Sequence, residues 1–478
     1  MSHLETRNSK PDTRIIIIGA GPGGYIAALK ASQLGASVAM VEKGHLGGTC
    51  LNWGCVPSKA LLSSAEVLHH AKHAAQWGVK VTGAEIDWPA VQARKDKIIT
   101  TLRGGIASLL KGRKVTHLIG TAKLDGPGKV IVDDGKGGVV SHTADHVIIG
   151  TGSQPIRIPG WPTDPALVST SDESVHWTTL PKELIIVGGG VIGCEFACIM
   201  NAVGVKVTLV ELMPQILATP GLDADLGKDL AKSFVKRGIT IHVGVKVQSV
   251  TAEGGVVSAT LDNGTVLKAD RLLVSVGRKP NTAGLNLESV GIQVTNRGFI
   301  PVDDTMATTA KGVWAIGDVN GRCLLAHAAS ANGVTAVENA LGCGHPFTAP
   351  IPSAVYTFPE IGAVGITEAD AKAQNLPYSV GRFPIGHLGK AMAAGDTEGF
   401  VKVIRHRETD VILGVHALGH NATEIIAAAG VLLHTKATVH DMAEAVFAHP
   451  TISEAVKEAA EDALGMSLHL PPRKIISA

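Results

Sequence analysis

Two cysteines with four residues between them, Cys50 and Cys55, stand at the start of an expected helix. Glycines before Cys50 and between the two cysteines let the backbone turn tightly enough to bring both sulfurs together. Pro57 suits the first turn of a helix, and the helix N-terminus and Lys59 both favour the thiolate, which is the reactive form of cysteine. The spacing therefore predicts a redox-active pair.

A metal site is the alternative for clustered cysteines and histidines. Zinc would need a second pair of ligands at a suitable spacing, which the remaining cysteines, Cys194, Cys198, Cys323 and Cys343, do not provide. His69, His70 and His73 lie on a polar stretch that indicates the solvated face of a helix. We therefore expect no metal ligands.

A glycine-rich turn before the cysteines predicts a dinucleotide-binding fold. An apolar strand leads into Gly19, Gly21 and Gly24, and the next strand ends at Glu42. The first glycine of such a motif makes the turn, the second lets a pyrophosphate approach the backbone, and the third lets the helix pack on the strand. The helix N-terminus would hold the phosphates, and the carboxylate would accept a hydrogen bond from a ribose hydroxyl.

The same motif occurs a second time, with Gly188, Gly190, Gly193 and the acidic Glu211. In both copies the acidic residue lies 18 positions after the third glycine. Each copy also closes with an aspartate, Asp145 or Asp270, that has a glycine seven positions later and a proline ten positions later. This repeat predicts two dinucleotide-binding domains from an internal duplication. The carboxylate of Glu211 favours the 2′-hydroxyl of NAD and repels the 2′-phosphate of NADP.

Composition sets further bounds. The 478 residues are enough for three or four domains, and 45% hydrophobic with 18% charged residues excludes a disordered chain. With 43 basic against 42 acidic residues, no global field attracts nucleic acid or an anionic membrane. The apolar run from Ile15 to Leu29 is interrupted by glycines and is too short for a membrane helix. We expect the first 14 residues to be neither a secretory signal nor a transit peptide. Six cysteines fit a reducing compartment, so we expect a cytoplasmic protein.

These motifs resemble those of the FAD-dependent pyridine nucleotide-disulfide oxidoreductases, and within them the branch that oxidises dihydrolipoamide. The similarity covers the disulfide segment at 47–62, the second FAD fingerprint at 314–318 and the His-Pro-Thr-x-Ser-Glu segment at 449–454. It runs from Arg14 to about Pro472. Trp53, Ala328, Ser330 and Phe447 depart from the usual family pattern.

The resemblance implies an α/β fold with two Rossmann-like dinucleotide-binding domains and a C-terminal α+β dimerisation domain. Residues 1–155 would bind FAD and carry the redox disulfide, and 156–280 would bind NAD. Residues 281–350 would complete the FAD site, and 351–478 would form the interface of a homodimer.

The resemblance also implies a role for each site residue. Cys50 would exchange with substrate, Cys55 would lie next to the flavin, His449 would be the base oriented by Glu454, and Lys59, paired with Glu195, would tune charge at the flavin edge. FAD would be bound by Gly19, Gly21, Gly24, Glu42, Gly48, Thr49, Lys59, Thr151, Gly152, Ser153, Asp318, Leu325, Ala326 and His327. NAD would be bound by Gly188, Gly190, Gly193, Glu211 and Gly277.

The implied reaction is oxidation of dihydrolipoamide by NAD+ through the disulfide and FAD. The implied partners are a lipoyl domain and the core acyltransferase of a 2-oxo acid dehydrogenase complex, or a glycine cleavage system. Glutathione reductase is disfavoured by Glu211 and by the Pro-Ser-Lys59 segment, and mercuric reductase by the lack of cysteines after Cys343. A subunit that serves mainly in docking and assembly is the alternative from another class.

Overall fold

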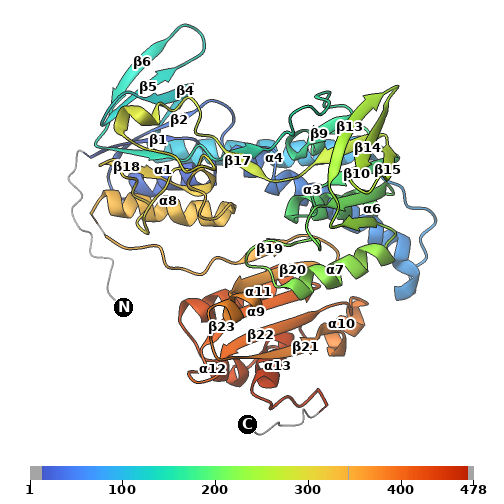
Figure 1. Cartoon of the computed structure of the whole chain (residues 1–478). Helices are drawn as coiled ribbons and strands as arrows, with labels where there is room; N and C mark the ends of the chain where they lie inside the picture. The colour runs from blue at the N-terminus through green and yellow to red at the C-terminus, as the bar shows by residue number, and fades with distance from the viewer. Residues whose placement is uncertain (1–12, 343, 472–478) are drawn as a thin grey trace. The chain divides into compact units, whose positions relative to one another are not determined.

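The computed structural model describes residues 13–342 and 344–471 (Figure 1). The chain divides into two compact units. The first unit takes the described residues up to Leu61, with Pro89–Ile156 and Gly277–Thr348. The second takes Leu62–Trp88, Arg157–Val276 and the described residues from Ala349 onward. The division into four segments that the sequence suggests stays a prediction.

A five-stranded parallel sheet forms the centre of the first unit. Its strands, in spatial order, are β18 (Val313–Ala315), β7 (His146–Ile149), β1 (Arg14–Ile18), β2 (Ser37–Glu42) and β3 (Thr116–Ile119). Helices α1 (Pro22–Gln33) and α8 (Ala326–Ala340) lie against each other beside this sheet (Figure 1). They approach so closely that a Cβ at Gly333 would lie only 2.6 Å from the carbonyl oxygen of Gly23, so this contact requires glycine.

Other elements of the first unit surround this sheet. An antiparallel sheet of β4 (Thr121–Leu124), β5 (Lys129–Asp133) and β6 (Val139–Thr143) is joined to it. A two-stranded ribbon pairs β8 (Ser153–Pro155) with β17 (Arg278–Pro280). The remaining helical segments are α2 (Gly48–Asn52), the start of α3 (Cys55–His73), most of α4 (Trp88–Gly112), η2 (Leu287–Val290) and η3 (Gly317–Asn320).

The second unit repeats this plan. Its parallel sheet has the order β12 (Thr240–Val243), β11 (Lys206–Glu211), β10 (Glu183–Val187), β16 (Arg271–Val274) and β9 (Val168–Thr170). A meander of β13 (Val247–Glu253), β14 (Val256–Leu261) and β15 (Val266–Ala269) precedes β16. Helices α6 (Val191–Ala202) and α7 (Ala224–Lys236) join the parallel strands, with short segments η1 (Ala74–Trp77) and α5 (Ser171–Ser174) elsewhere in the unit.

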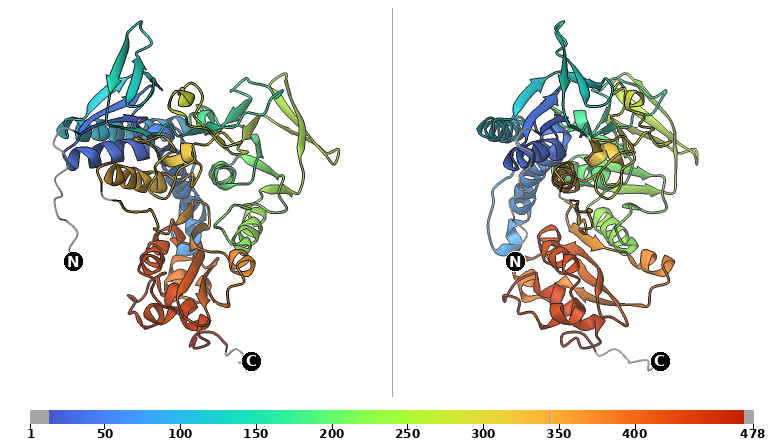
Figure 2. Two further views of the ribbon diagram at one scale, coloured as in Figure 1. Left: turned by 60° about the vertical axis from the view of Figure 1, so that its left-hand side comes forward. Right: turned by 90° about the vertical axis from the view of Figure 1, so that its left-hand side faces the viewer.

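The C-terminal part of the second unit is an antiparallel sheet with helices beside it, drawn in orange and red in Figure 2. The strand order is β19 (Ser353–Val355), β20 (Glu360–Gly365), β23 (Ile412–Gly419), β22 (Phe400–His406) and β21 (Tyr378–Pro384). The helical segments are α9 (Glu368–Ala373), η4 (Ile385–His387), α10 (Gly389–Ala394), α11 (Ala422–His434), α12 (Val439–Glu444) and α13 (Glu454–Ala463).

Small residues set the packing of this C-terminal layer. A Cβ at Gly381 in β21 would lie 2.0 Å from the carbonyl oxygen of Ala459, so only glycine lets α13 approach the sheet. Buried side chains between the sheet and its helices form one apolar cluster that includes Phe383, Val403 and Val456. The α/β class with a C-terminal α+β layer is thereby confirmed. Along the described residues, we find no helix with the length and hydropathy that crossing a bilayer requires.

Candidate active site

The two cysteines lie on two consecutive helices, with a glycine turn before the first, rather than on one helix. Cys50 belongs to the one-turn helix α2, and Cys55 is the first residue of α3. The turn depends on Gly47 and Gly48, whose φ angles of 89° and 55° lie in the left-handed region. A Cβ at Gly48 would also lie 2.6 Å from the Cα of Gly21. The cysteine turn is therefore packed directly against the first glycine motif.

Cys50 and Cys55 interact with each other. Their hydrogen bond and the burial of Cys50 raise the pKa of the Cys50 thiol far above its ordinary value, while the charge of Lys59 acts in the opposite direction. Cys50 is half-buried and Cys55 is exposed. Which sulfur exchanges with substrate and which lies next to the flavin stays a prediction.

The first glycine motif has two packed glycines and one open glycine. A Cβ at Gly19 would lie 2.3 Å from the oxygen of Gly150, and one at Gly24 would lie 1.8 Å from the oxygen of Gly19. At Gly21 the nearest neighbour of such a Cβ is the Cα of Gly48, 4.0 Å away. This middle glycine thus leaves room at the N-terminus of α1, as a bound pyrophosphate requires.

The second motif is built in the same way. A Cβ at Gly188 would lie 2.4 Å from the oxygen of Ser275, and one at Gly193 would lie 1.8 Å from the oxygen of Gly188. A Cβ at Gly190 would have no heavy atom of the described chain within 4 Å, apart from those of its neighbours in the sequence. In both motifs the middle glycine, which is expected beneath the phosphates, is the one that leaves space for a ligand. Both motifs therefore fit a bound dinucleotide.

The acidic residue that follows each motif is tied to the backbone by both oxygens. Glu42 accepts hydrogen bonds from the amides of Ala20 and Gly44, each at 2.7 Å. Glu211 accepts from the amides of Gly189 at 2.5 Å and Met213 at 2.7 Å. Each carboxylate is therefore fixed beside its glycine turn, where it can also accept from a ribose hydroxyl.

Asp318 is brought to the start of the ribbon formed by β8 and β17. The hydroxyl of Ser153 donates to Asp318 Oδ2 at 2.6 Å and accepts from Arg278 Nε at 2.7 Å. Thr151 and Asn281 hold the same turn, with the Thr151 hydroxyl donating to the Asn281 oxygen at 2.8 Å. Asp318, the residue expected at the flavin ribityl chain, thus belongs to one hydrogen-bonded group with Ser153 and Arg278.

Leu325, Ala326 and His327 lie at the N-terminus of α8, where Leu325 is the N-cap residue. Backbone N–H groups in this first turn have no partner within the helix and can face a ligand. No side-chain cap hydrogen bond is formed there among the described residues. The backbone therefore fits the role expected for this segment.

His449 and Glu454 form a pair at the start of α13. Nδ1 of His449 lies 2.9 Å from Oε1 of Glu454, and the amide of Thr451 donates to Oε2 at 2.8 Å. An ionised carboxylate cannot donate, so Nδ1 carries the hydrogen and Nε2 can accept a proton. The imidazole is 78% exposed. Burial opposes ionisation of Glu454, yet hydrogen bonds from Thr451 and His449 lower its pKa below the usual value.

Some expected partners lie in different units. Lys59 belongs to the first unit and Glu195 to the second, and their pairing stays a prediction. Glu195 is buried in α6, where it accepts a hydrogen bond from the amide of Tyr356 at 3.1 Å. The cysteine turn and His449 are likewise divided between the units.

Sequence reasoning missed three residues around the cysteine turn. Tyr25 is half-buried on α1, where burial and the nearby Cys50 raise the pKa of its phenol. A hydrogen bond joins Asn52 in α2 to Arg103 in α4. The position of Asn52 between the cysteines was a signal that could have found it, whereas nothing local marks Tyr25 or Arg103.

Metal ligation has no visible basis in the described residues. Across 13–342 and 344–471, no group of three or more His, Cys, Asp or Glu side chains is arranged to hold an ion.

Comparison with known proteins decides the family. The model for pyridine nucleotide-disulphide oxidoreductases matches residues 13–333, and the model for the dimerisation domain of the same family matches residues 351–460. The chain belongs to the pyridine nucleotide-disulphide oxidoreductase family. It is therefore an oxidoreductase of a family that depends on FAD and NAD(H), and its dimerisation domain supports a homodimer.

Named relatives span nearly the whole chain. Mitochondrial dihydrolipoyl dehydrogenase of Pisum sativum is 41% identical over 95% of this chain and 92% of its own. Dihydrolipoyl dehydrogenase of Bacillus subtilis is 40% identical over 95% and 98%. Leghemoglobin reductase of Glycine max is 42% identical over 93% and 86%.

Solved structures agree with the family assignment. LpdA of Mycobacterium tuberculosis superposes with a TM-score of 0.88 at 30% identity, covering 94% of this chain and 99% of its own. The HOCl-induced flavoprotein disulfide reductase RclA of Escherichia coli superposes with a TM-score of 0.83 at 27% identity, covering 94% and 99%. The resemblance found in the sequence is confirmed.

Proposed function

We propose that this enzyme is a dihydrolipoyl dehydrogenase that oxidises dihydrolipoamide to lipoamide and reduces NAD+. The observation that carries the proposal is the hydrogen-bonded pair Cys50 and Cys55, which lies next to a turn packed against Gly21 of the first dinucleotide motif. A thiol pair at that place can pass electrons between a dithiol substrate and a bound flavin. The near full-length relatives named dihydrolipoyl dehydrogenase support this choice of dithiol.

The proposed chemistry begins with a disulfide between Cys50 and Cys55. A thiolate of dihydrolipoamide attacks the sulfur of Cys50, which breaks the enzyme disulfide and forms a mixed disulfide. The second thiolate of the substrate then displaces Cys50 and closes the lipoamide ring. Two electrons and two protons have left the substrate, and the cysteine pair is reduced.

His449 is the proposed base for these thiols. Its Nδ1 hydrogen is directed to Glu454, so Nε2 can take a proton from a substrate thiol. The carboxylate of Glu454 then stabilises the resulting imidazolium and keeps the ring oriented. By resemblance, each site takes this histidine from the partner subunit, which makes the homodimer the active form.

When bound, FAD and NAD+ supply the acceptors for the two electrons that leave the cysteine pair. Around Gly21 and Gly190 the open backbone would hold the two pyrophosphates, and Asp318 would bind the ribityl chain. Lys59, close enough to act electrostatically on Cys50, would favour negative charge at this site.

NAD rather than NADP is the proposed coenzyme. Glu211 is held at the place where it would accept from the 2′-hydroxyl of NAD and repel a 2′-phosphate. Leu212, Met213, Pro214 and Gln215 follow it, and none of these can neutralise a phosphate. A lipoyl domain and an acyltransferase core remain the proposed partners, and a cytoplasmic location the proposed compartment.

The experiment that tests this function compares dithiol donors. Purified flavin-loaded enzyme is mixed with dihydrolipoamide, reduced glutathione or dithiothreitol, each with NAD+ and with NADP+, and formation of the reduced coenzyme is followed. We expect dihydrolipoamide with NAD+ to be the most efficient combination. Equal or faster turnover with glutathione would contradict the proposal.

A docking role is separated from catalysis by one variant. The Cys50→Ser, Cys55→Ser double variant should lose turnover while still binding an acyltransferase core in a pull-down assay. If this variant supported full turnover, the proposed function of the cysteine pair would be wrong.

A further inference from the structure

Asn52 is a buried polar residue located between the two redox cysteines, and it is only 2% exposed. Its amide nitrogen donates to the carbonyl oxygens of Leu46 at 3.0 Å and Gly48 at 2.8 Å. Its oxygen accepts a hydrogen bond from Nη2 of Arg103 at 2.5 Å. The two carbonyls and the guanidinium fix the orientation of the amide, because the flipped amide would set like groups against each other.

These contacts hold the backbone that carries Cys50. Leu46 precedes the left-handed glycine turn and Gly48 belongs to it, and α2 is too short to be stable by its own hydrogen bonds. The same turn is tied to the first dinucleotide motif, because the amide of Gly47 donates to the oxygen of Ala20 at 2.8 Å. Asn52 thus connects the position of Cys50 to the place where the motif would hold a dinucleotide.

Arg103 reaches Asn52 from the middle of the long helix α4. Its Nε is buried and has no hydrogen-bond partner among the described residues. A guanidinium that is partly removed from water makes a strong, charge-assisted hydrogen bond to the atom it does reach. Arg103 meets the redox turn through its hydrogen bond to Asn52, whereas Cys55 and Lys59 act on the Cys50 thiol itself.

We propose that Asn52 and Arg103 form a clamp that positions the redox turn and keeps Cys50 within bonding distance of Cys55. Both are positioning residues. The inference rests on the proposed redox role of the cysteine pair but not on which dithiol is the substrate. Its test therefore measures the cysteine pair directly, without a lipoyl compound.

The first measurement is the equilibrium between dithiol and disulfide. Flavin-loaded Asn52→Leu and Arg103→Met enzymes are equilibrated in mixtures of reduced and oxidised dithiothreitol, and the Cys50–Cys55 state is read by alkylation and mass spectrometry. Loosening the turn lowers the effective concentration of one sulfur at the other. We expect the equilibrium constant for disulfide formation to fall about tenfold, which is roughly 30 mV for a two-electron couple.

The second measurement is the pH profile of Cys50 alkylation in the reduced enzyme. In the clamped turn, the hydrogen bond with Cys55 and burial raise the pKa of the Cys50 thiol. We expect both variants to be alkylated faster and with a midpoint at lower pH than the parent enzyme. Lys97→Met is the matched control, because it removes an exposed cation from the same helix, and both readouts should stay within about twofold of the parent.

The double variant tests whether the two residues act as one clamp. Once Asn52→Leu has been introduced, Arg103→Met should change either readout by less than about twofold. Independent, multiplicative effects would overturn the proposal, as would parent-like readouts in variants that retain flavin and melt normally. Should Arg103→Met fail to fold, Arg103→Gln repeats the test with a neutral side chain of shorter reach. Turnover of glutathione instead of dihydrolipoamide would overturn the proposed substrate and leave the clamp standing.

Discussion

Glu42 and Glu211 make the same contact in two separate dinucleotide-binding folds. Glu42 accepts a hydrogen bond from the amide of Ala20, and Glu211 accepts one from the amide of Gly189. Each carboxylate thereby joins the glycine turn after the first strand to the end of the second strand. The duplication read from the sequence extends to individual hydrogen bonds, so these two residues can serve as matched controls for each other.

Coenzyme preference should depend on Glu211. Repulsion between this carboxylate and a 2′-phosphate costs about 1 to 4 kcal/mol, and loss of the ribose hydrogen bond adds about 1.5 to 3 kcal/mol. We expect kcat/KM to favour NAD over NADP by about a hundredfold, and Glu211→Gln to reduce that ratio by about tenfold. Glu42→Gln should weaken flavin retention and leave the ratio unchanged. Equal efficiencies with the two coenzymes in the parent enzyme would refute the role of Glu211.

Glu454 should set the pH dependence of the dithiol half-reaction. Its pKa is lower in the folded protein, so its ionised form stabilises the fold above about pH 4.3, and this contribution is lost as pH falls through the folded value. At neutral pH the carboxylate is charged and stabilises the imidazolium of His449. Glu454→Gln should slow reduction by dihydrolipoamide about tenfold and move the acidic limb of the rate profile to lower pH.

The control for this prediction is Glu444→Gln, which changes an exposed carboxylate at the end of α12. Its stopped-flow profile should match that of the parent enzyme. A Glu454→Gln profile that also matches the parent would mean that Glu454 does not assist the base.

A shared active site should be visible by complementation. His449→Gln should slow reduction by dihydrolipoamide by about 10² to 10⁴, while reduction of the flavin by NADH stays near normal. Mixing inactive Cys50→Ser subunits with inactive His449→Gln subunits creates heterodimers in which one site has both residues. Recovered activity supports a base supplied by the partner subunit. A verified heterodimer without activity would rule it out.

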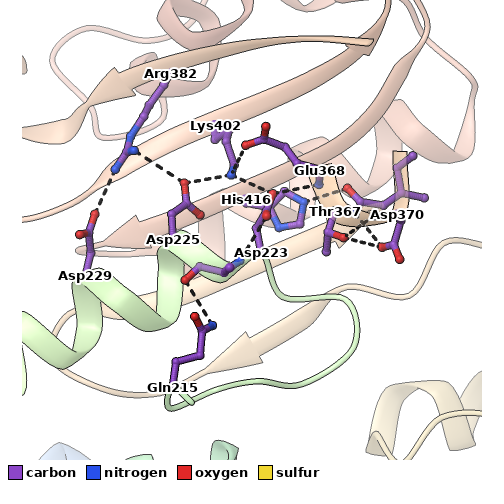
Figure 3. A network of polar contacts seen from close by, with 12 residues as sticks. Gln215, Asp223, Asp225, Asp229, Thr367, Glu368, Asp370, Arg382, Lys402 and His416 are labelled. Carbon is purple, nitrogen blue, oxygen red and sulfur yellow. Dashed lines mark hydrogen bonds and ion pairs between the residues drawn. The ribbon is translucent and has the colours of Figure 1, made fainter. Parts of the chain in front are cut away.

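Lys402 should be a strong determinant of stability. Its ammonium group is 2% exposed and lies 2.8, 2.9 and 3.0 Å from Asp223, Asp225 and Glu368 (Figure 3). This cluster connects α7 and the loop before it with the C-terminal sheet inside the second unit. Lys402→Met leaves the buried carboxylate of Asp223 and the half-buried carboxylates of Asp225 and Glu368 uncompensated, and it should lower the free energy of unfolding by about 3 to 5 kcal/mol. Lys206→Met breaks an exposed pair with Glu183 and should lower it by less than about 1 kcal/mol in the same denaturant titration.

The stability curve of the parent enzyme should reflect this cluster. Burial opposes charge on Lys402, but hydrogen bonds with Asp223 and Asp225 raise its pKa, so its contribution is complete below about pH 10 and is lost as pH rises further. Burial also opposes ionisation of Asp223, yet Lys402 lowers its pKa, and that contribution is lost as pH falls below about 4. Lys402→Met should flatten both limbs.

The parts of this protein that follow local rules could be predicted from its sequence. The spacing of the glycines and of the acidic residues after them predicted both dinucleotide-binding motifs. The apolar strands beside these motifs predicted the two parallel sheets, because both signals are properties of short segments. The C-terminal region was expected to be an α+β domain, and it forms an antiparallel sheet with helices beside it.

The remaining features depend on contacts between distant segments. Arg103 and Asn52 are 51 positions apart, and Lys402 and Asp225 are 177 apart, so no pattern of sequence neighbours predicts that these pairs are in contact. The sequence also predicted one helix start at the cysteines, whereas α2 and α3 are separate. That break falls at Trp53, the C-cap residue of α2, whose φ of −136° is not helical.

The measurement that tests the central claim most directly is anaerobic stopped-flow analysis of Cys50→Ser and Cys55→Ser. We expect both to lose NADH formation from dihydrolipoamide by a factor of about 10³ or more, while NADH still reduces the flavin at a near-normal rate. A lone Cys55 thiolate in Cys50→Ser should give a long-wavelength charge-transfer band with oxidised FAD, and Cys55→Ser should not. NADH formation that survives in either variant would contradict electron transfer through this pair, and a band in Cys55→Ser alone would reverse the roles of the two sulfurs.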